Sequence, residues 1–441
     1  MSRVRVRRYY GSRVSLTIGE GERVSGPVRF VHAADLHLDA PFKGIDASDP
    51  RVREDLVAAP LGALDAVVAT CLEREVDFLL LAGDVYNSAE RSLRTEFAFR
   101  DACERLDEAG IRVFIARGNH DPASGSSAAL AMPSNVHVFP ADEVERVVVE
   151  RDGEPICSVY GRSFRTAAET ANLALGFARQ DDDALAVGVL HTNVGGRPGH
   201  EPYAPCSLDD LRAARMDYWA LGHIHKPEVL LEDPPIVYSG CTQGLHPGEH
   251  GPRGCFVVTL DGSGAVLERV STARLIWGAA SVTADDLLTV DDLREALVAA
   301  MDGATQDADG IPAVVRLELH GRSETHATLA RRGVLDDLLA DVRSAGLERE
   351  PWVWVDRLTD RTRPALDLDL VREGSDFAAD LVRLTDALLA DEEAAAACLD
   401  GVMRPVLGAL DARDVPPVDS RDIISRARDL ALDRLLAEER R

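Results

Sequence analysis

The chain has few cysteines for its length, and none lies in a metal-binding or disulfide pattern. Its seven cysteines are scattered along 441 residues and include no Cys-x-x-Cys pair. An odd number at irregular spacing argues against a disulfide framework, and the missing pairs argue against a zinc cage of thiolates. This usage is typical of a reducing compartment, so we expect a cytoplasmic protein.

Long uncharged apolar runs are also missing. No stretch of 18 apolar residues lacks a charge, and the opening MSRVRVRRYYGSRV contains arginines but no apolar core of a secretory signal. We therefore expect no membrane span and no leader peptide, and we predict that residues 1–26 form a flexible basic arm. Lysine occurs only at positions 43 and 226, so 47 of the 49 basic residues are arginines, which we attribute to codon composition.

Positive charge is scarce relative to negative charge. The formal net charge is −26 at pH 7, whereas the hydrophobic share of 46% is normal for a globular protein with a core. A protein with this charge should not coat nucleic acids through non-specific attraction to phosphates. A polyanionic substrate must therefore be held locally by metal ions and a few arginines, or with the help of a partner.

An alternation of strand-like and helix-like segments begins at Val28. Apolar runs typical of buried strands cover 28–35, 77–84, 111–116, 156–161, 184–191, 217–223, 235–240 and 254–260. Helical periodicity covers 51–75, 90–109, 166–178 and 207–215. Strands that alternate with helices, followed by a run of strands, predict a layered α/β domain over residues 27–275.

Two further units are expected after this domain. Residues 280–360 contain helix patterns at 292–302 and 324–344 and strand patterns at 313–321 and 351–358, which predict a small α+β cap. Residues 361–441 are rich in Ala, Leu, Asp, Glu and Arg and are predicted to be helical, with a break at the Pro-Pro pair 416–417. The apolar faces of helices at 376–390 and 422–440 either pack within the chain or dock onto a partner's helices.

Side chains that can bind metals follow five of the predicted strands. They are Asp35 and His37, then Asp84, then Asn119, His120 and Asp121, then His191, and finally His223 and His225. Ligand sites in open α/β sheets lie outside the carboxyl ends of the strands, so we expect these side chains to meet. Each motif alone is also typical of an ordinary polar strand end or turn. The order, strand context and residue types of the whole set together indicate a metal centre.

The chemistry of these residues indicates hydrolysis at phosphorus. Oxygen and nitrogen ligands without a thiolate suit two divalent cations such as Mn²⁺, Fe²⁺ or Zn²⁺, and Asp84 is the natural bridge between them. Two metals about 3.5–4 Å apart clamp the attacking and leaving oxygens of an in-line displacement and produce hydroxide at neutral pH. His120 is predicted to protonate the leaving oxygen, and Asp121 to orient the His120 imidazole.

The motifs resemble those of the calcineurin-like metallophosphoesterase superfamily, in the same order. They read DLH (35–37), GD (83–84), GNHD (118–121), His191 and GHIH (222–225). Within the superfamily the chain resembles the DNA-repair exonuclease branch, with its SbcD-type nuclease subunits, and most closely the YhaO-like group. That resemblance is carried by HAADLHLDAPFKG (32–44), GNHDP (118–122), LHTNVGG (190–196), DYWALGHIHKPE (217–228) and VYSGCTQGLHPGE (237–249), and it covers about residues 28–260.

The resemblance implies a fold, a metal centre and partners. The fold is a four-layer α/β sandwich of two mixed β-sheets flanked by helices, with a small cap and a helical C-terminal region. One metal is expected on Asp35, His37, Asp84 and His225, and the other on Asp84, Asn119, His191 and His223, with Mn²⁺ as the first expectation. The implied activity is exonucleolytic cleavage of DNA in repair or end processing, beside an SMC-like coiled-coil ATPase, with a homodimer as a further expectation.

Two departures and several substrate contacts complete the predictions. Asn87 stands where the family's nucleases usually have Asp or His, and Cys241-Thr242 replaces a small residue followed by proline. We interpret Cys241 as a buried filler rather than a nucleophile. Phosphate contacts are predicted for Asn87, Arg162, Arg165, Arg197 and His246, the alternative being that they are ordinary surface or loop residues.

Two other functions stay open. One is a phosphoesterase that acts on small nucleotides or phosphoproteins, which the negative net charge favours and the nuclease-like motifs disfavour. The other is a non-catalytic scaffold subunit that keeps its metals for structure, against which the intact His120 and Asp121 argue. Substitution of His120 separates these hypotheses, because only an enzyme loses turnover while it keeps its metal.

Overall fold

The computed structural model describes residues 26–42, 44–45, 47–87, 92–125, 130–197, 201–306, 308–407 and 419–439. The predicted basic arm, apart from Gly26, and the Pro-Pro break lie outside these residues.

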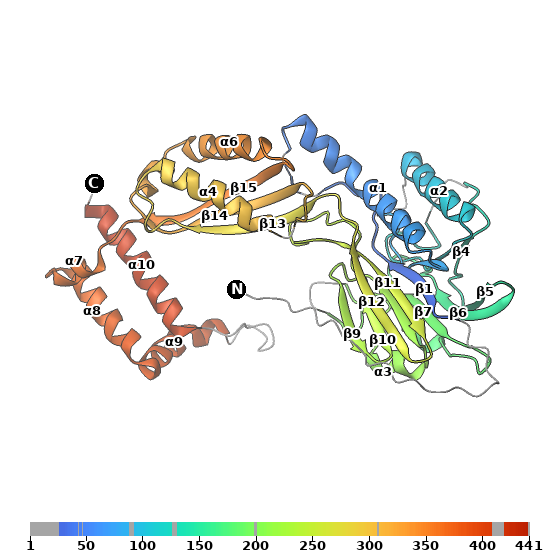
Figure 1. Cartoon of the computed structure of the whole chain (residues 1–441). Helices are drawn as coiled ribbons and strands as arrows, with labels where there is room; N and C mark the ends of the chain where they lie inside the picture. Colours follow the sequence, from blue (N-terminus) through green and yellow to red (C-terminus); the bar gives the residue numbers. More distant parts are fainter. Residues whose placement is uncertain are drawn as a thin grey trace, which may run out of the picture.

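Two six-stranded mixed sheets form the body of the molecule (Figure 1). The first has the order β12-β11-β1-β2-β3-β4, built from β1 (Val28–Ala33), β2 (Phe78–Leu81), β3 (Arg112–Ile115), β4 (Val136–Val138), β11 (Gly254–Asp261) and β12 (Gly264–Ser271). The second has the order β5-β6-β7-β8-β10-β9, built from β5 (Glu145–Arg151), β6 (Glu154–Arg162), β7 (Ala186–His191), β8 (Tyr218–Gly222), β9 (Glu228–Glu232) and β10 (Pro235–Tyr238). In the first sheet β1 to β4 run parallel, and β11 is antiparallel to both of its neighbours, β1 and β12. In the second sheet the four central strands run parallel, and an antiparallel pair lies at each edge.

The two sheets face each other across an apolar core. Phe30, Phe78 and Tyr218 are fully buried there, and the Phe30 ring lies 5.0 Å from that of Phe78 and 5.2 Å from that of Tyr218. Strands buried on both faces read as continuous apolar runs, which is why the sequence identifies them so readily. The predicted sandwich of two mixed sheets is confirmed.

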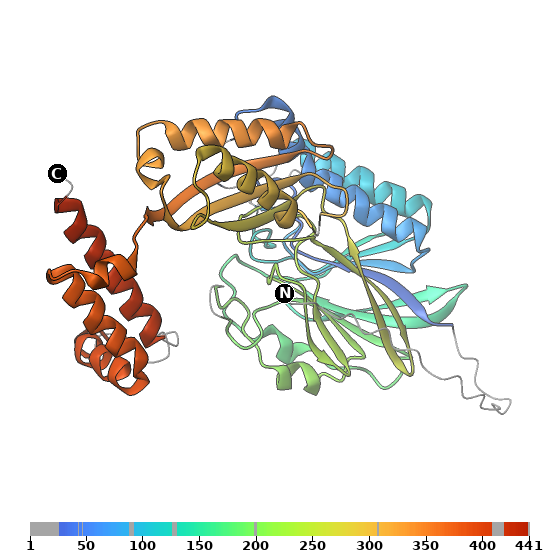
Figure 2. The same cartoon turned by 60° about the vertical axis from the view of Figure 1, so that its left-hand side comes forward.

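Helices cover the outer faces of both sheets. The first sheet carries α1 (Pro50–Glu73) and α2 (Leu93–Glu108), which lie side by side in both views (Figures 1 and 2). The second carries α3 (Leu208–Ala213) and a short 3₁₀ helix, η1 (Leu173–Gly176). The helix predicted over 166–178 is therefore wrong except for this turn. Asn172 caps the turn, and the segment buries Leu173 and Phe177 without a longer helix.

Helix α1 has the length and apolar composition of a membrane span. About half of its most apolar part is buried inside the fold, where Leu64, Val67 and Cys71 pack on the first sheet. The apolar face of α1 is thus used by the core, as expected for a long helix that covers a sheet.

The cap is a three-stranded sheet with helices on one face (Figure 1). Its elements are β13 (Ile276–Thr283), α4 (Val290–Ala304), β14 (Ala313–Ser323), α5 (His326–Leu329), α6 (Val334–Leu347) and β15 (Val353–Pro364). Both strand pairs are parallel, so the cap is a β-α-β-α-β unit rather than the predicted α+β module. The sequence gives no strand pattern for β13, because exposed middle residues interrupt its apolar run.

A cluster of tryptophans joins the cap to the sandwich. Trp277, Trp352 and Trp354 are buried against Val52 and Leu56 of α1. The indole Nε1 of Trp352 donates a hydrogen bond of 2.7 Å to a carboxylate oxygen of Asp55 in α1. Burial of large aromatic rings together with a satisfied N–H stabilises this junction.

The C-terminal region consists of α7 (Leu368–Glu373), α8 (Phe377–Ala390), α9 (Glu392–Leu407) and α10 (Ser420–Glu439). These helices lie beyond the cap, away from the sandwich, in both views (Figures 1 and 2). Val382 and Leu432 form their small core, while Phe377 and Leu384 stay exposed. Internal packing therefore accounts for only part of their apolar surface.

Candidate active site

The strand ends bring the predicted metal-binding side chains together. Four of these residues have positive φ, namely Asp35 (51°), His37 (44°), Asp84 (52°) and His223 (97°). A left-handed backbone is uncommon for residues with a Cβ, and such strain is typical of functional sites. Each of the four follows the end of a strand in either sheet, where the backbone turns sharply to aim the side chain at its neighbours.

One group of ligands comes mainly from the ends of β1 and β8. Ligand atoms of Asp35, His37 and His225 lie within 4.8 Å of one another. The Nε2 atoms of His37 and His225 are 3.2 Å apart. Two imidazole nitrogens that face each other so closely are suited to a shared cation.

The second group surrounds Asn119. Its Oδ1 lies 2.9 Å from Nε2 of His191 and 3.3 Å from Nδ1 of His223. Asp84 connects the two groups, because its Oδ2 lies 3.4 Å from Nε2 of His191 and 3.9 Å from Nε2 of His37. Its other oxygen, Oδ1, accepts the backbone N–H of His120 at 2.9 Å. Asp84 thus lies between the two groups, within reach of His37 on one side and His191 on the other.

Hydrogen bonds set the tautomers of three of the histidines. His191 Nδ1 lies 3.0 Å from the Ala82 carbonyl, and His223 Nε2 lies 2.9 Å from the Glu201 carbonyl. His225 Nδ1 lies 2.5 Å from a carboxylate oxygen of Glu249. Each acceptor requires an N–H donor, so the opposite ring nitrogen presents its lone pair to the site. This donor set fits divalent cations.

Burial makes the charges of the site unfavourable without a cation. It raises the pKa of Asp35 to about 7 and that of Asp84 to about 6, because a buried carboxylate loses its hydration. It lowers the pKa of His191 to about 4 for the same reason. Burial also opposes the charged form of His225, but the bond to Glu249 and the charges of Asp35 and Asp84 outweigh it and raise its pKa to about 9. A bound cation would favour ionised carboxylates and neutral imidazoles instead.

Two glycines of the motifs are required by close approach. Gly83 has a φ of +96°, and a Cβ there would lie 2.3 Å from Nδ1 of His191. A Cβ at Gly118 would lie 2.3 Å from Oδ1 of Asp84 and 2.9 Å from the His191 ring. Contacts below 3.0 Å force atoms apart, so these positions need glycine if the ligands are to keep their places.

Comparisons with known proteins agree with this geometry. Residues 28–227 match the family model of the calcineurin-like phosphoesterases, and residues 277–363 match that of the middle domain of metallophosphoesterase YhaO. The protein described as "Uncharacterized metallophosphoesterase YhaO" from Bacillus subtilis is 36% identical over 344 residues, which cover 77% of this chain and 83% of that protein. The chain belongs to the calcineurin-like metallophosphoesterases, in the YhaO-like group.

More distant relatives of this metallophosphoesterase are described as DNA double-strand break repair proteins Mre11. The protein from Aeropyrum pernix is 27% identical over 56% of this chain and 61% of its own length. That from Methanocaldococcus jannaschii is 25% identical over 50% of this chain and 58% of its own length. The chain thus spans less than two thirds of these Mre11 proteins. Metallophosphoesterases use a dinuclear metal site, and the two ligand groups supply the residue types for one.

His120 lies at the open side of this metallophosphoesterase site. Its ring packs edge-on against that of His37, with the centroids 4.9 Å apart. Its Nδ1 donates to the backbone carbonyl of Asn87 at 2.8 Å. The oxygens of Asp121 accept the backbone N–H groups of Gly118 and Val85, at 2.8 and 3.0 Å. The structure therefore corrects the prediction that Asp121 orients the imidazole. The Asn87 carbonyl does so, and Asp121 holds the loop backbone.

Only some of the residues predicted to contact phosphate lie at the site. Asn87 acts through its backbone, whose N–H donates to Asp39 at 2.6 Å. Arg162 donates to the Ala141 carbonyl at 3.2 Å, and Arg197 forms a two-pronged ion pair with Glu228. Neither Arg162 nor Arg197 lines the two cavities that contain the metal-binding residues, so the structure does not bring these arginines to the site. Only His246 shares a cavity with a ligand, His225.

The structure also reveals residues that the sequence analysis did not assign. Glu249 binds His225, and Tyr203 and Glu201 line a cavity of about 440 Å³ with His120 and His223. Glu249 lies 24 residues after His225 in a loop, so no local spacing links the two. Burial raises the pKa of the Cys241 thiol, which agrees with its interpretation as an inert filler.

Proposed function

We propose that this metallophosphoesterase is a DNA nuclease that hydrolyses phosphodiester bonds with two divalent cations, Mn²⁺ being the first candidate. The observation that carries the proposal is the pair of ligand groups bridged by Asp84 beside an exposed His120. The Mre11 relatives support DNA as the substrate. Oxygen and nitrogen donors without thiolate suit Mn²⁺ and agree with the proposed metal.

In the proposed reaction, some side chains bind the cations and His120 transfers a proton at the scissile phosphate. When bound, the two cations stabilise negative charge on the phosphoryl oxygens and supply a nucleophile at neutral pH. Asp35, His37, Asp84 and His225 would hold one cation, and Asp84, Asn119, His191 and His223 would hold the other. Because Nδ1 of His120 is bonded to the Asn87 carbonyl, Nε2 is the ring atom left to give a proton to the leaving oxygen.

Replacement of His120 by asparagine tests this assignment. The contact of His120 with Asp84 runs through the backbone N–H, so the variant keeps it. We expect the rate of cleavage of end-labelled DNA with Mn²⁺ to fall about 10²–10⁴-fold, as for loss of a general acid, with unchanged metal content. His320→Asn in the cap strand β14 is the matched control. Full activity of His120→Asn would contradict the proposed role.

A small diester, bis-p-nitrophenyl phosphate, separates the proposal from its alternatives. Hydrolysis of this compound with untouched single- and double-stranded DNA would favour a phosphoesterase for small nucleotides or phosphoproteins. Metal binding without either activity would favour a scaffold subunit. Cleavage of both substrates, with both reactions lost in His120→Asn, is the result that we expect.

We also propose that the enzyme works in the cytoplasm beside a coiled-coil ATPase of the SMC type. The exposed Phe377 and Leu384 on α8 offer apolar surface to a partner helix. A protein with a net charge of −26 benefits from a partner that holds DNA. Co-elution of the purified chain with such an ATPase, lost in Phe377→Ser and Leu384→Ser, is expected. Unchanged co-elution of the two variants would show that Phe377 and Leu384 do not contact the ATPase.

A further inference from the structure

A second cavity adjoins the metal-binding residues on the side of His225. It has a volume of about 650 Å³ and is lined by His225, Lys226, the loop that carries His246 and Arg253, and Arg269 of β12. Glu249 is the only acidic side chain among its described lining residues, and it is bonded to His225. The cavity therefore has a surplus of positive charge, in a chain whose net charge is −26.

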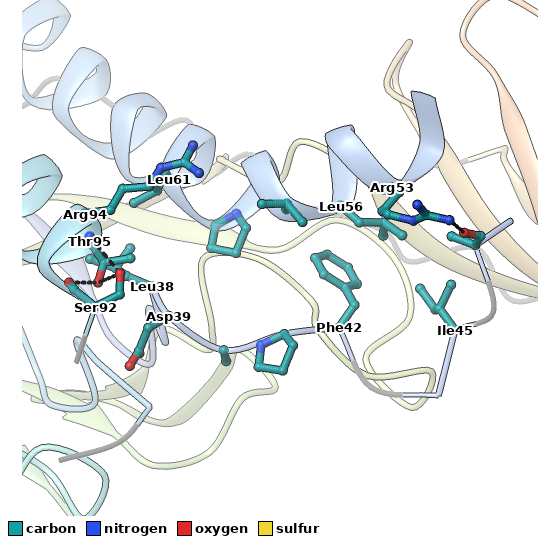
Figure 3. A pocket seen from close by; sticks show the side chains of 15 residues that line it. Leu38, Asp39, Phe42, Ile45, Arg53, Leu56, Leu61, Ser92, Arg94 and Thr95 are labelled. Carbon is teal, nitrogen blue, oxygen red and sulfur yellow. Dashed lines mark hydrogen bonds between the residues drawn. The ribbon is translucent and has the colours of Figure 1, made fainter. Parts of the chain in front are cut away.

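The neighbouring cavities differ from it in character. The cavity at His120 also contains His225 but has Glu201 and no Lys or Arg among its described lining residues. A third cavity, of about 500 Å³, lies between α1 and the segment after His37 (Figure 3). It is walled by apolar side chains such as Phe42, Leu56 and Leu61, and Arg53 on its rim donates to the Ala47 carbonyl. Of the three, only the cavity beside His225 suits a chain of phosphates.

Among the described residues, no carboxylate oxygen lies within ion-pair distance of Lys226, Arg253 or Arg269. At longer range the charge of Lys226 acts on Glu228 and that of Arg253 acts on Glu249, lowering the pKa of both carboxyl groups. Arg269 donates to the Pro252 carbonyl at 2.5 Å. Arg253 is buried and donates to the carbonyl oxygens of His225, His250 and Glu249, at 2.7, 3.2 and 3.4 Å. Backbone carbonyls thus fix the Arg253 guanidinium in place, and Glu249 balances part of its charge. Arg197 differs, because Glu228 pairs with it.

We propose that this basic cavity binds the phosphodiester backbone of the DNA strand next to the scissile phosphate, with Lys226 and Arg269 as its exposed phosphate contacts. The assignment rests on the proposed nuclease function and names the place where the strand is held. His225 belongs to both cavities, so a strand bound here passes directly into the metal centre. Local positive charge solves the problem that an acidic chain otherwise repels its substrate.

The test is the double variant Lys226→Gln/Arg269→Gln, compared with Arg331→Gln/Arg332→Gln, an exposed pair in the cap. Binding of a labelled single-stranded oligonucleotide is followed by fluorescence anisotropy from 50 to 300 mM salt, with calcium in place of the catalytic metal. We expect the slope of log affinity against log salt to become shallower by about 1.4, since each phosphate contact contributes about 0.7. The KM for DNA should rise on the order of tenfold, with kcat for bis-p-nitrophenyl phosphate unchanged.

The outcomes separate the two proposals. If the wild-type protein cleaves DNA and the double variant keeps its KM and salt slope, the cavity assignment fails alone. If the wild-type protein hydrolyses the small diester but neither binds nor cleaves DNA, both proposals fail. Inorganic phosphate is the second probe: phosphate binding that is lost in the double variant, with an unchanged DNA slope, would assign the cavity to a small anion and overturn its assignment to DNA.

Discussion

Glu249→Gln should weaken metal binding without unfolding the protein. One carboxylate oxygen of Glu249 lies 2.5 Å from Nδ1 of His225, and the other accepts the backbone N–H groups of Leu245 and His246 at 2.6 and 3.1 Å. Glutamine has the same shape but only one acceptor oxygen. It can therefore satisfy His225 or the loop amides, but not both.

The magnitude follows from the kind of bond that is lost. A hydrogen bond to a charged group contributes about 1.5–3 kcal/mol, and loss of a carboxylate behind a metal-binding histidine typically lowers metal affinity about 10–100-fold. At 1.4 kcal/mol for each factor of ten, these figures agree. We therefore expect the Kd for Mn²⁺ to rise about 10–100-fold at the position that includes His225, and no comparable change at the other.

Calorimetric titration of metal-free protein with Mn²⁺ measures this change, and elemental analysis gives the number of ions bound. The control is Glu145→Gln, because Glu145 makes a similar contact with His137, 2.9 Å long, but on β5 outside the ligand groups. The control should bind metal like the wild-type protein. A Kd for Glu249→Gln within threefold of the wild-type value would refute the role of Glu249 in holding His225.

Three further predictions follow from the same geometry. Gly118→Ala should reduce phosphodiesterase activity at least 10²-fold, because the alanine Cβ would displace Asp84. The control is Gly303→Ala, where a Cβ meets open space, and this variant should keep full activity in the same kinetic assay. Metal affinity should fall as the pH drops below 9, because His225, with a pKa of about 9, must lose its proton to bind a cation. Asp35, with a pKa of about 7, should make the decline steeper below pH 7. Calorimetric titrations in two buffers measure the protons released on metal binding, and no release at pH 8 would contradict this prediction. Trp352→Ala should lower the free energy of unfolding, measured by urea denaturation, by about 3–5 kcal/mol, because it leaves a cavity in the buried junction between cap and sandwich. An unchanged midpoint of the urea transition would show that the junction contributes little to stability.

The fold was predictable in the segments where burial leaves a clear pattern of apolar residues in the sequence. Strands such as β2 and β7 are buried on both faces, so they appear as short apolar runs between turn residues. Strands without fully buried side chains gave no such signal. For example, β4 and β12 have few fully buried side chains and were missed. The segment 166–178 has helical spacing, but its apolar residues meet the second sheet through a loop and a single turn.

The metal-binding residues were predictable because the fold places strand ends together. Asp35 and Asp84 each follow a strand and His191 is the last residue of β7, and the order of parallel strands in two facing sheets makes them neighbours. The surroundings were not predictable in the same way. Which carbonyl accepts from His120, or which carboxylate reaches His225, depends on loop conformation, which neither periodicity nor spacing reports.

The two halves of the metal centre differ in what stands behind their histidines. His191 and His223 donate to backbone carbonyls, which are neutral, whereas His225 donates to a carboxylate. A charged acceptor makes the imidazole a more basic ligand, so we expect His225 to hold a cation more strongly than His191 or His223 would. The same side of the centre carries the basic cavity, where the extra negative charge of Glu249 is offset by Lys226, Arg253 and Arg269. Glu249 makes His225 a stronger ligand, and the same cations that would hold the DNA strand surround the Glu249 carboxylate. Its negative charge therefore need not repel the phosphate backbone.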